Sequence, residues 1–289
     1  MSYLRRVYLL PAEVEDRLVA DLWLAGTLGV RTESVEDGRV RLEAYFAGGN
    51  SRASDGLAVG EGGGGEWMAG VEKVSEETLA DADWMVVYRA TVRAFPVGRS
   101  LWVDPREPGE AEGEVPPEGR TLLRLPARMA FGTGSHESTG LVVEILESLE
   151  LRGLAVLDVG TGTGILCFVA LSFGAARPVG CDIDPVAPFN ARANSRLNDL
   201  YPRLFAGGLG ALSACARFDL ALVNIVPEQI LPELPALVRL VRPGGGVILS
   251  GILGERASGV LEQAATLGLF EQGRREAGGW VALHLRSVR

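Results

Sequence analysis

The second half of the chain alternates short apolar runs with segments whose apolar residues recur at helical spacing. Strands are predicted at residues 154–159, 179–182, 218–224, 247–250 and 280–285. Helices are predicted at residues 165–173, 185–197, 228–241 and 255–267. Short apolar strands separated by helices indicate an α/β domain with a mainly parallel sheet covered on both faces. Right-handed crossovers place the carboxyl ends of the strands at one edge, where ligands bind.

The first part of the chain has a different pattern, typical of a small α+β unit. Residues 7–10 predict the end of a strand, and residues 12–24 have apolar side chains at helical spacing. Residues 30–35 and 40–46 alternate as strands do, and the hairpin signal Glu36-Asp-Gly-Arg39 joins them. The order strand-helix-strand-strand favours an incomplete or interrupted ferredoxin-like unit.

Glycine-rich and proline-rich segments separate the two parts. Residues 48–70 include the run from Gly62 to Gly65 and predict a flexible loop. Residues 74–89 predict a second helix of the small unit, residues 100–103 a strand, and residues 104–120 a long solvated loop. We therefore predict three parts: a small α+β domain at residues 1–95, a linker or loop at 96–120, and a second domain at 121–289.

Composition narrows the class of protein. The net charge of −9 argues against binding along a nucleic-acid backbone, which requires a basic face. The three cysteines have no metal-ligand spacing, so no metal site is expected. No apolar run reaches the roughly 20 residues of a membrane helix, and the first residues carry no apolar signal segment. These features predict a cytoplasmic protein that does not bind membranes.

A glycine-rich turn between a strand and a helix is the most informative local motif. It reads Ala155-Val-Leu-Asp158-Val-Gly160-Thr-Gly162-Thr-Gly164-Ile165. Glycines permit positive φ and let the backbone approach a ligand closely. Asp182 follows Gly160 by 22 positions, at the end of the next predicted strand, which suits a carboxylate that accepts hydrogen bonds from both ribose hydroxyls. The motif predicts a nucleoside-binding loop.

Two details favour S-adenosylmethionine over a nicotinamide dinucleotide. The usual dinucleotide pattern has Gly or Ala at its sixth position, where this chain has Ile165. Asp158 lies two residues before the first glycine, and a carboxylate there suits the cationic amino-acid end of a ligand better than a pyrophosphate. The alternative for Asp158 is a purely local role in capping the loop.

Four sequence runs together resemble one family. They are Met129-Ala-Phe-Gly132-Thr-Gly134-Ser-His136-Glu-Ser-Thr139, Val179-Gly-Cys-Asp182-Ile-Asp184-Pro185, Phe218-Asp-Leu-Ala-Leu-Val-Asn224-Ile-Val and Pro243-Gly-Gly-Gly-Val-Ile-Leu-Ser-Gly251-Ile-Leu. With the glycine loop, this set is similar to the bacterial ribosomal protein L11 methyltransferase family, PrmA. The similarity covers roughly residue 83 to the C-terminus, and the run around Gly132 and His136 is its most specific part.

The resemblance implies a fold and an activity. The expected fold is a Rossmann-like seven-stranded methyltransferase sheet with a small N-terminal domain for substrate recognition. The expected activity is S-adenosylmethionine-dependent methylation of lysine and N-terminal amino groups on a large-subunit ribosomal protein, L11. The resemblance also implies cofactor contacts at Thr139, Gly160, Asp182 and Asn224. Gly162, Gly164 and Asp158 complete the cofactor-binding set that we predict.

Candidate residues for the chemistry lie at the predicted sheet edge. The amide oxygen of Asn224 and the backbone carbonyl of Ile225 could accept hydrogen bonds from a substrate amine, although asparagine is also common in turns after strands. His136 either contacts substrate or cofactor or fixes the loop before it. Phe131 either lines the pocket or packs in the core. Thr139 lies near a helix start, where capping is the alternative.

Three other functions remain open. The enzyme could methylate a different protein or a small-molecule amine. It could be a nicotinamide-dependent oxidoreductase, but the second half of the chain contains no lysine, because the only one is Lys73. It could also be a binding module without catalysis, against which the intact glycine loop and Asn224 argue.

Overall fold

The structure is a computed structural model that describes residues 2–25, 27, 29–47, 69–80, 93–109, 115–126, 136–213, 215 and 217–288. The chain divides into two compact units, Met1–Val92 and Arg93–Arg289. The first unit has one sheet and the second has two, each unit has its own core, and each is described by itself below.

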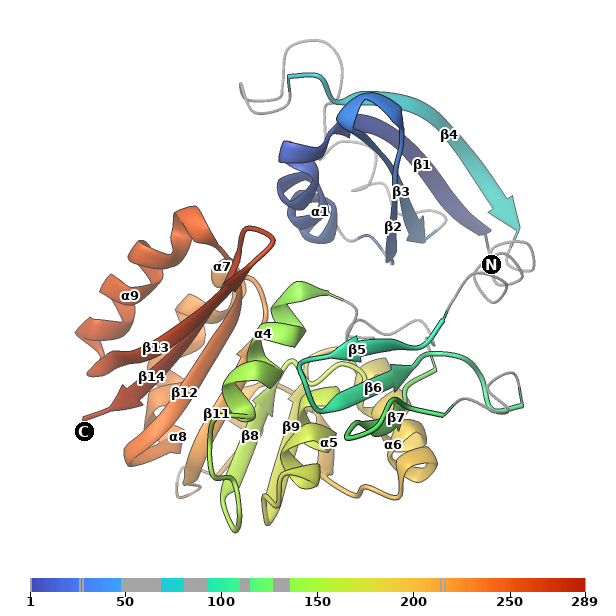
Figure 1. Ribbon diagram of the computed structural model, residues 1–289. Coiled ribbons are helices and arrows are strands. Elements are labelled where there is room, and N and C mark those ends of the chain that lie inside the picture. The colour runs from blue at the N-terminus through green and yellow to red at the C-terminus, as the bar shows by residue number, and fades with distance from the viewer. Residues whose placement is uncertain are drawn as a thin grey trace. The chain divides into compact units, whose positions relative to one another are not determined.

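The first unit is a four-stranded antiparallel sheet with one helix. Its elements are β1 (Ser2–Pro11), η1 (Ala12–Val14), α1 (Glu15–Leu24), β2 (Gly29–Ser34), η2 (Glu36–Gly38), β3 (Arg39–Ala47) and β4 (Glu72–Ala80). The strand order is β2-β3-β1-β4, which is the order of a ferredoxin-like sheet (Figure 1). Leu18 and Leu22 of α1 pack against Leu10, Leu42 and Phe46 of the sheet. The predicted strand-helix-strand-strand order is present.

The second helix predicted at residues 74–89 is wrong over its first half. That stretch is strand β4, which pairs antiparallel with β1, while residues 81–92 lie outside the described part. Arg6 of β1 donates to Glu76 of β4 at 2.7 Å, so the charged residues of β4 have partners on the neighbouring strand. Pairing along β1 outweighs the local helix propensity of a stretch rich in Glu, because tertiary context routinely overrides propensity.

The second unit is built around a seven-stranded sheet. Its strands are β8 (Ala155–Val159), β9 (Arg177–Asp182), β10 (Arg203–Ala206), β11 (Phe218–Asn224), β12 (Val241–Leu253), β13 (Leu269–Ala277) and β14 (Trp280–Ser287). Their order is β10-β9-β8-β11-β12-β14-β13 (Figure 1). The first five strands in this order are parallel to one another, and β14 is antiparallel to both β12 and β13. The predicted α/β fold with a seven-stranded sheet is confirmed.

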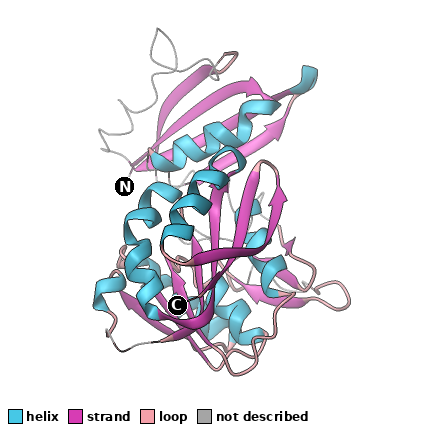
Figure 2. Cartoon of the chain, turned by 90° about the vertical axis from the view of Figure 1, so that its left-hand side faces the viewer, coloured by secondary structure: helices cyan, strands magenta, loops and turns pink. Residues whose placement is uncertain are grey.

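Helices pack on both faces of this sheet (Figure 2). They are α4 (Glu137–Leu146), α5 (Ile165–Ser172), α6 (Val186–Asn198), α7 (Pro227–Ile230), η5 (Leu231–Glu233), α8 (Leu234–Leu240), η6 (Gly254–Arg256) and α9 (Ala257–Thr266). A short η4 (Leu209–Ala211) follows β10. On one face, Leu157 and Val223 of the strands pack with Leu237 of α8 and Val260 of α9. No helix among the described residues has the length and apolar character needed to span a membrane.

The sequence predictions for this unit differ from the structure at several elements. The helix predicted at residues 228–241 is divided into α7, η5 and α8, because Pro232 and Pro235 interrupt the pattern of main-chain hydrogen bonds. Strands β10 and β13 were not among the predicted elements, and helix α4 was predicted only as a start near Thr139. Strand β13 is an edge strand whose residues after Leu269 are mostly exposed, so it lacks an apolar alternation that would reveal it.

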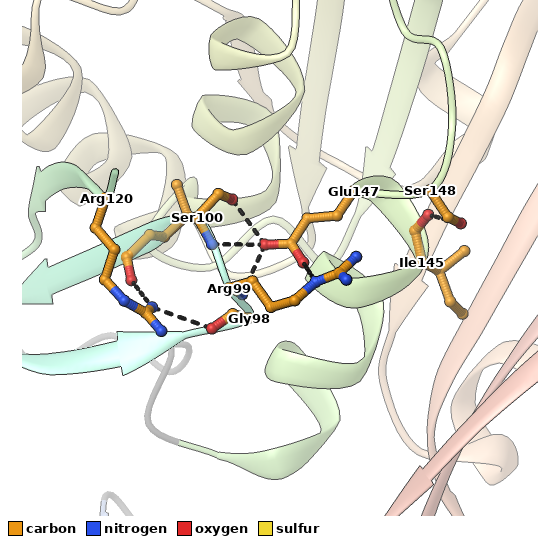
Figure 3. Close-up of polar contacts among 8 residues, drawn as sticks. Gly98, Arg99, Ser100, Arg120, Ile145, Glu147 and Ser148 are labelled. Atoms are coloured by element: carbon orange, nitrogen blue, oxygen red, sulfur yellow. Dashed lines mark hydrogen bonds and ion pairs between the residues drawn. The ribbon is translucent and has the colours of Figure 1, made fainter. Parts of the chain in front are cut away.

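A second, three-stranded sheet corrects the predicted linker at residues 96–120. Its strands β5 (Phe95–Val97), β6 (Leu101–Asp104) and β7 (Thr121–Arg124) belong to the second unit, so only part of the segment is a loop. Glu147, just after α4, accepts hydrogen bonds from the backbone N–H groups of Arg99 and Ser100 at 2.7 and 2.8 Å (Figure 3). The Ser100 hydroxyl donates to the same carboxylate. This contact fixes the β5–β6 turn to the end of α4.

Candidate active site

The glycine-rich turn follows β8 and leads into α5. Gly160, Gly162 and Gly164 have φ values of 71, 52 and 86°, in the region that favours glycine. The N–H groups of Gly160 and Thr161 both donate to the carbonyl of Cys181, at 2.9 and 3.0 Å, which ties the turn to the end of β9. A Cβ atom on residue 160 would lie 2.7 Å from Cγ2 of Ile225. Only glycine fits the first position of the turn.

Asp158 is a buried carboxylate near the end of β8, two residues before Gly160. The Thr161 hydroxyl donates to its Oδ2 at 2.7 Å, and no donor among the described residues forms a hydrogen bond with its Oδ1. Burial raises the pKa of the Asp158 carboxyl from 3.8 to about 6, and the hydrogen bond from Thr161 opposes the rise. The site therefore holds an acid with one free acceptor oxygen.

Asp182 ends β9, the strand beside β8. Its Oδ2 accepts from the N–H of Gly162 at 3.0 Å, and its Oδ1 accepts from the N–H of Asp184 at 3.0 Å. Each carboxylate oxygen has further lone pairs, so this orientation leaves acceptor capacity for a ligand. The hydrogen bond to Gly162 also links the position of the carboxylate to the shape of the glycine turn.

Asn224 ends β11, on the other side of β8. Its Nδ2 donates to the hydroxyl of Thr139, in the first turn of α4, at 3.0 Å. Its Oδ1 is buried and has no hydrogen-bond partner among the described residues. A buried acceptor without a partner is costly in the free protein and is expected where a ligand supplies the missing donor.

The backbone after Asn224 is approached closely by the next strand. Gly251, in β12, has a φ of 78°. A Cβ atom there would lie 3.1 Å from both the carbonyl carbon and the carbonyl oxygen of Ile225. Glycine at residue 251 therefore lets two strand ends come together beside the Asn224 amide, and the Ile225 carbonyl lies in the same region.

Comparison with known proteins identifies the family. The model for "Ribosomal protein L11 methyltransferase (PrmA)" matches residues 20–287. The chain belongs to the PrmA family.

Relatives and a solved structure agree with this. A ribosomal protein L11 methyltransferase from Pelobacter propionicus is 37% identical over 217 residues, 72% of this chain and 68% of the relative. One from Geobacter metallireducens is 39% identical over 206 residues, 71% of this chain and 67% of the relative. The crystal structure of a ribosomal protein L11 methylase from Lactobacillus delbrueckii subsp. bulgaricus is similar, with a TM-score of 0.61 and 30% identity. It covers 68% of this chain and 99% of the solved chain. The predicted family is confirmed, and so is the prediction that the protein is a methyltransferase.

His136 has a local structural role in this PrmA protein. It is the N-cap of α4, where its Nδ1 accepts from the backbone N–H of Ser138 at 3.2 Å. Its ring lies edge-on to Trp280, with 4.6 Å between ring centroids. Burial lowers the pKa of His136, in keeping with a neutral ring that accepts a hydrogen bond. A direct contact with substrate or cofactor stays a prediction.

Two predicted features are not placed. Phe131 and the run from residue 129 to 135 lie outside the described residues, so the two roles considered for Phe131 both stay predictions. Among the described residues, no group of three His, Cys, Asp or Glu side chains could hold a metal ion.

The sequence analysis missed two polar residues that shape the site. The buried hydroxyl of Ser250, in β12, donates to the carbonyl of Ser138 at 2.9 Å. The Nδ2 of Asn194, in α6, donates to the carbonyl of Thr163 in the glycine turn at 3.1 Å. Ser250 lies within one of the family's sequence runs, next to Gly251, which was a usable signal. Asn194 had none, because only the packing of α6 brings it to the turn.

Proposed function

We propose that this chain is an S-adenosylmethionine-dependent N-methyltransferase that acts on lysine and N-terminal amino groups of ribosomal protein L11. Membership of the PrmA family supports the reaction class, and the names of its relatives support the substrate. The structural observation that carries the proposal is the buried, unpartnered Oδ1 of Asn224, which is an acceptor suited to a substrate amine. We also propose that the enzyme works in the cytoplasm, and that the unit Met1–Val92 recognises the protein substrate while the second unit methylates it.

The residues around the glycine turn fit the proposed cofactor. The positive-φ glycines leave the backbone open to close approach by a nucleoside, and Asp182 would accept hydrogen bonds from the ribose hydroxyls. The free oxygen of Asp158 suits the cationic amino-acid end. Thr139, which the resemblance implies as a further cofactor contact, is hydrogen-bonded to Asn224. When bound, the cofactor supplies a methyl group that its sulfonium has already activated.

The protein must present an amine whose nitrogen lone pair is free. A lysine amine has a pKa of about 10.4, so removing its proton near pH 7.5 costs about 4 kcal/mol. A water-poor site disfavours the ammonium form and reduces this cost, and the released proton goes to solvent. The Oδ1 of Asn224 and the carbonyl of Ile225 would then accept hydrogen bonds from the two N–H groups of the neutral amine. These bonds would direct the lone pair of the nitrogen toward the methyl group. Such positioning accounts for much of the rate without a strong general base.

Transfer of label from S-adenosyl-L-[methyl-³H]methionine to purified L11 tests the proposal. The wild-type enzyme should label L11, Asp182→Ala should raise the cofactor Kd, and Asn224→Ala should lower kcat with a much smaller change in that Kd. Wild-type protein that binds the cofactor but leaves L11 unlabelled would contradict the proposed substrate. Other ribosomal proteins and small amines, assayed in parallel, would identify the acceptor instead.

A further inference from the structure

We propose that Ser250 is a positioning residue for methyl transfer: it holds the first turn of α4 so that Thr139 fixes the orientation of the Asn224 amide. This inference rests on the proposed function, because it assumes that Asn224 receives the substrate amine. Ser250 does not approach the reacting atoms in this scheme. It acts through the main chain of α4.

Two hydrogen bonds attach one turn of α4 to two neighbouring strand ends. Asn224 of β11 and Ser250 of β12 are partners in the register of the parallel sheet. Asn224 donates to the side chain of Thr139, and Ser250 donates to the carbonyl of the preceding residue, Ser138. Ser138, Thr139 and Ser250 are each at most 3% exposed, so the bond from Ser250 to Ser138 is shielded from water, while Asn224 itself is partly exposed. The first turn of α4 therefore has a fixed distance from both strand ends.

This attachment holds the Asn224 amide through its Nδ2. A primary amide has one donor end and one acceptor end, and a substrate amine that offers N–H bonds needs the acceptor. With Nδ2 occupied by the Thr139 hydroxyl, Oδ1 is left as the free group. If the α4 turn moves away from β12, the Thr139 hydroxyl moves with it, and the Asn224 amide loses the hydrogen bond that holds it in place.

Gly251 supports the same arrangement from the other side. Its backbone lies against Ile225, where a Cβ atom would be 3.1 Å from the carbonyl group. The proposed acceptor pair consists of the Asn224 Oδ1 and the Ile225 carbonyl. Ser250 is linked to Asn224 indirectly, through α4, and Gly251 lies directly against Ile225. These two residues of β12 therefore support both acceptors, but neither would bind the amine itself.

The test compares Ser250→Ala with a matched control in the same sheet. Ser287, in β14, is also buried, and its hydroxyl has no hydrogen-bond partner among the described residues. Ser287→Ala therefore makes the same atomic change without removing a hydrogen bond between described residues. Ser250→Thr restores the hydroxyl, and Ser250→Cys replaces Ser250→Ala if the alanine variant does not fold.

The kinetic readout separates positioning from general damage. Because small misplacements of reacting groups cost one to two orders of magnitude, we expect Ser250→Ala to lower kcat for L11 methylation about tenfold or more. The cofactor Kd, measured by calorimetry, should change less than kcat does, because Ser250→Ala keeps the Thr139 side chain, which is itself a predicted cofactor contact. Ser287→Ala should keep wild-type kcat, and Ser250→Thr should recover most of it. Unchanged kcat in Ser250→Ala, or equal losses in both alanine variants, would overturn the proposal.

A spectroscopic readout keeps the inference separate from the proposed function. The sequence has five asparagines, so selective ¹⁵N-asparagine labelling gives five side-chain amide pairs, and Asn224→Asp identifies one of them. Ser250→Ala should shift the Asn224 pair and speed its exchange with solvent, whereas Ser287→Ala should not. An unchanged Asn224 pair contradicts the inference even if L11 is methylated. A changed pair in an enzyme whose wild type does not label L11 contradicts the substrate and leaves the positioning role in place.

Discussion

Replacing Asp158 by asparagine should stabilise the free protein and weaken cofactor binding. Asp158 is 1% exposed, and burial raises the pKa of its carboxyl from 3.8 to about 6. At neutral pH the folded protein must therefore hold a charge that the unfolded chain holds more easily. Asp158→Asn removes that charge and keeps an acceptor for the Thr161 hydroxyl, which donates to Asp158 at 2.7 Å.

The sign and size of the effect follow from the two pKa values. A carboxyl with a raised pKa in the folded state contributes stability that is fully present below pH 3.8 and is lost as the pH rises through about 6. The full difference between the two pKa values corresponds to about 3 kcal/mol in the free energy of unfolding. Because about half of the loss has already occurred at pH 5, the advantage of Asp158→Asn should grow by about 1.4 kcal/mol between pH 5 and 7.5.

Urea denaturation of both proteins at pH 5.0, 6.0, 7.0 and 7.5 measures this difference. Burial lowers the pKa of His136 and of His284, so each contributes stability that is lost as the pH falls below about 6.5, the reverse of the Asp158 effect. Comparing variant with wild type at each pH cancels these histidine contributions. An advantage that does not depend on pH, or one that shrinks toward pH 7.5, would refute the reasoning.

Cofactor binding should show the opposite sign. The proposed role of Asp158 needs its ionised form, so the affinity of the wild type for S-adenosylmethionine should fall as the pH drops through about 6. Asp158→Asn should bind more weakly at pH 7.5 and show less change with pH. Calorimetric titration over the same pH values measures both. Equal affinities of variant and wild type at pH 7.5 would mean that Asp158 only shapes the loop.

Three further predictions concern single residues. Glu147→Gln should lower the free energy of unfolding by about 1 to 3 kcal/mol in urea, since it weakens charged acceptor bonds to the β5–β6 turn; a loss below about 0.5 kcal/mol would contradict this. Gly160 has a φ of 71°, and a Cβ atom there would lie 2.7 Å from Cγ2 of Ile225, so Gly160→Ala should displace the glycine turn. A shift of even about 1 Å should reduce cofactor affinity at least about tenfold, measured by calorimetry. Wild-type affinity in this variant would contradict the prediction. His136→Asn should keep the hydrogen bond that caps α4 at the Ser138 N–H. Because the group whose pKa is lowered by burial is removed, the variant should lose less stability than the wild type below about pH 6.5. Melting temperatures of both proteins at pH 5.5 and 7.5 measure this, and an equal difference in the two proteins would count against it.

The fold was predictable where local and tertiary preferences agree. Buried parallel strands such as β8 and β11 are continuous apolar runs, so the sequence predicts them almost to the residue. Edge strands are different. Strand β4 is rich in Glu and becomes a strand only because β1 offers it backbone and charge partners, and β13 has an exposed, charged surface. Their conformation is decided by neighbours far away in sequence, which periodicity does not reveal.

The candidate site was predictable as a set of residue types but not as a geometry. The glycine turn, Asp182 and Asn224 follow from motif spacing and strand ends. The contact between Asn224 and Thr139 joins residues that are 85 positions apart, and no local pattern specifies it. Ser250 was missed for a similar reason: its hydroxyl matters only because the first turn of α4 crosses the end of β12. Unpartnered atoms such as the Oδ1 of Asn224 are visible only after folding.

The most direct test of the central claim is label transfer from S-adenosyl-L-[methyl-³H]methionine to purified L11, with wild-type enzyme and Asn224→Ala side by side. We predict that the wild type labels L11 and that Asn224→Ala binds the cofactor but transfers label at least about tenfold more slowly, because the acceptor that positions the amine is lost. Equal transfer rates in the two proteins would contradict the role of the Asn224 amide. Cofactor binding with no label on L11 from the wild type would contradict the proposed substrate.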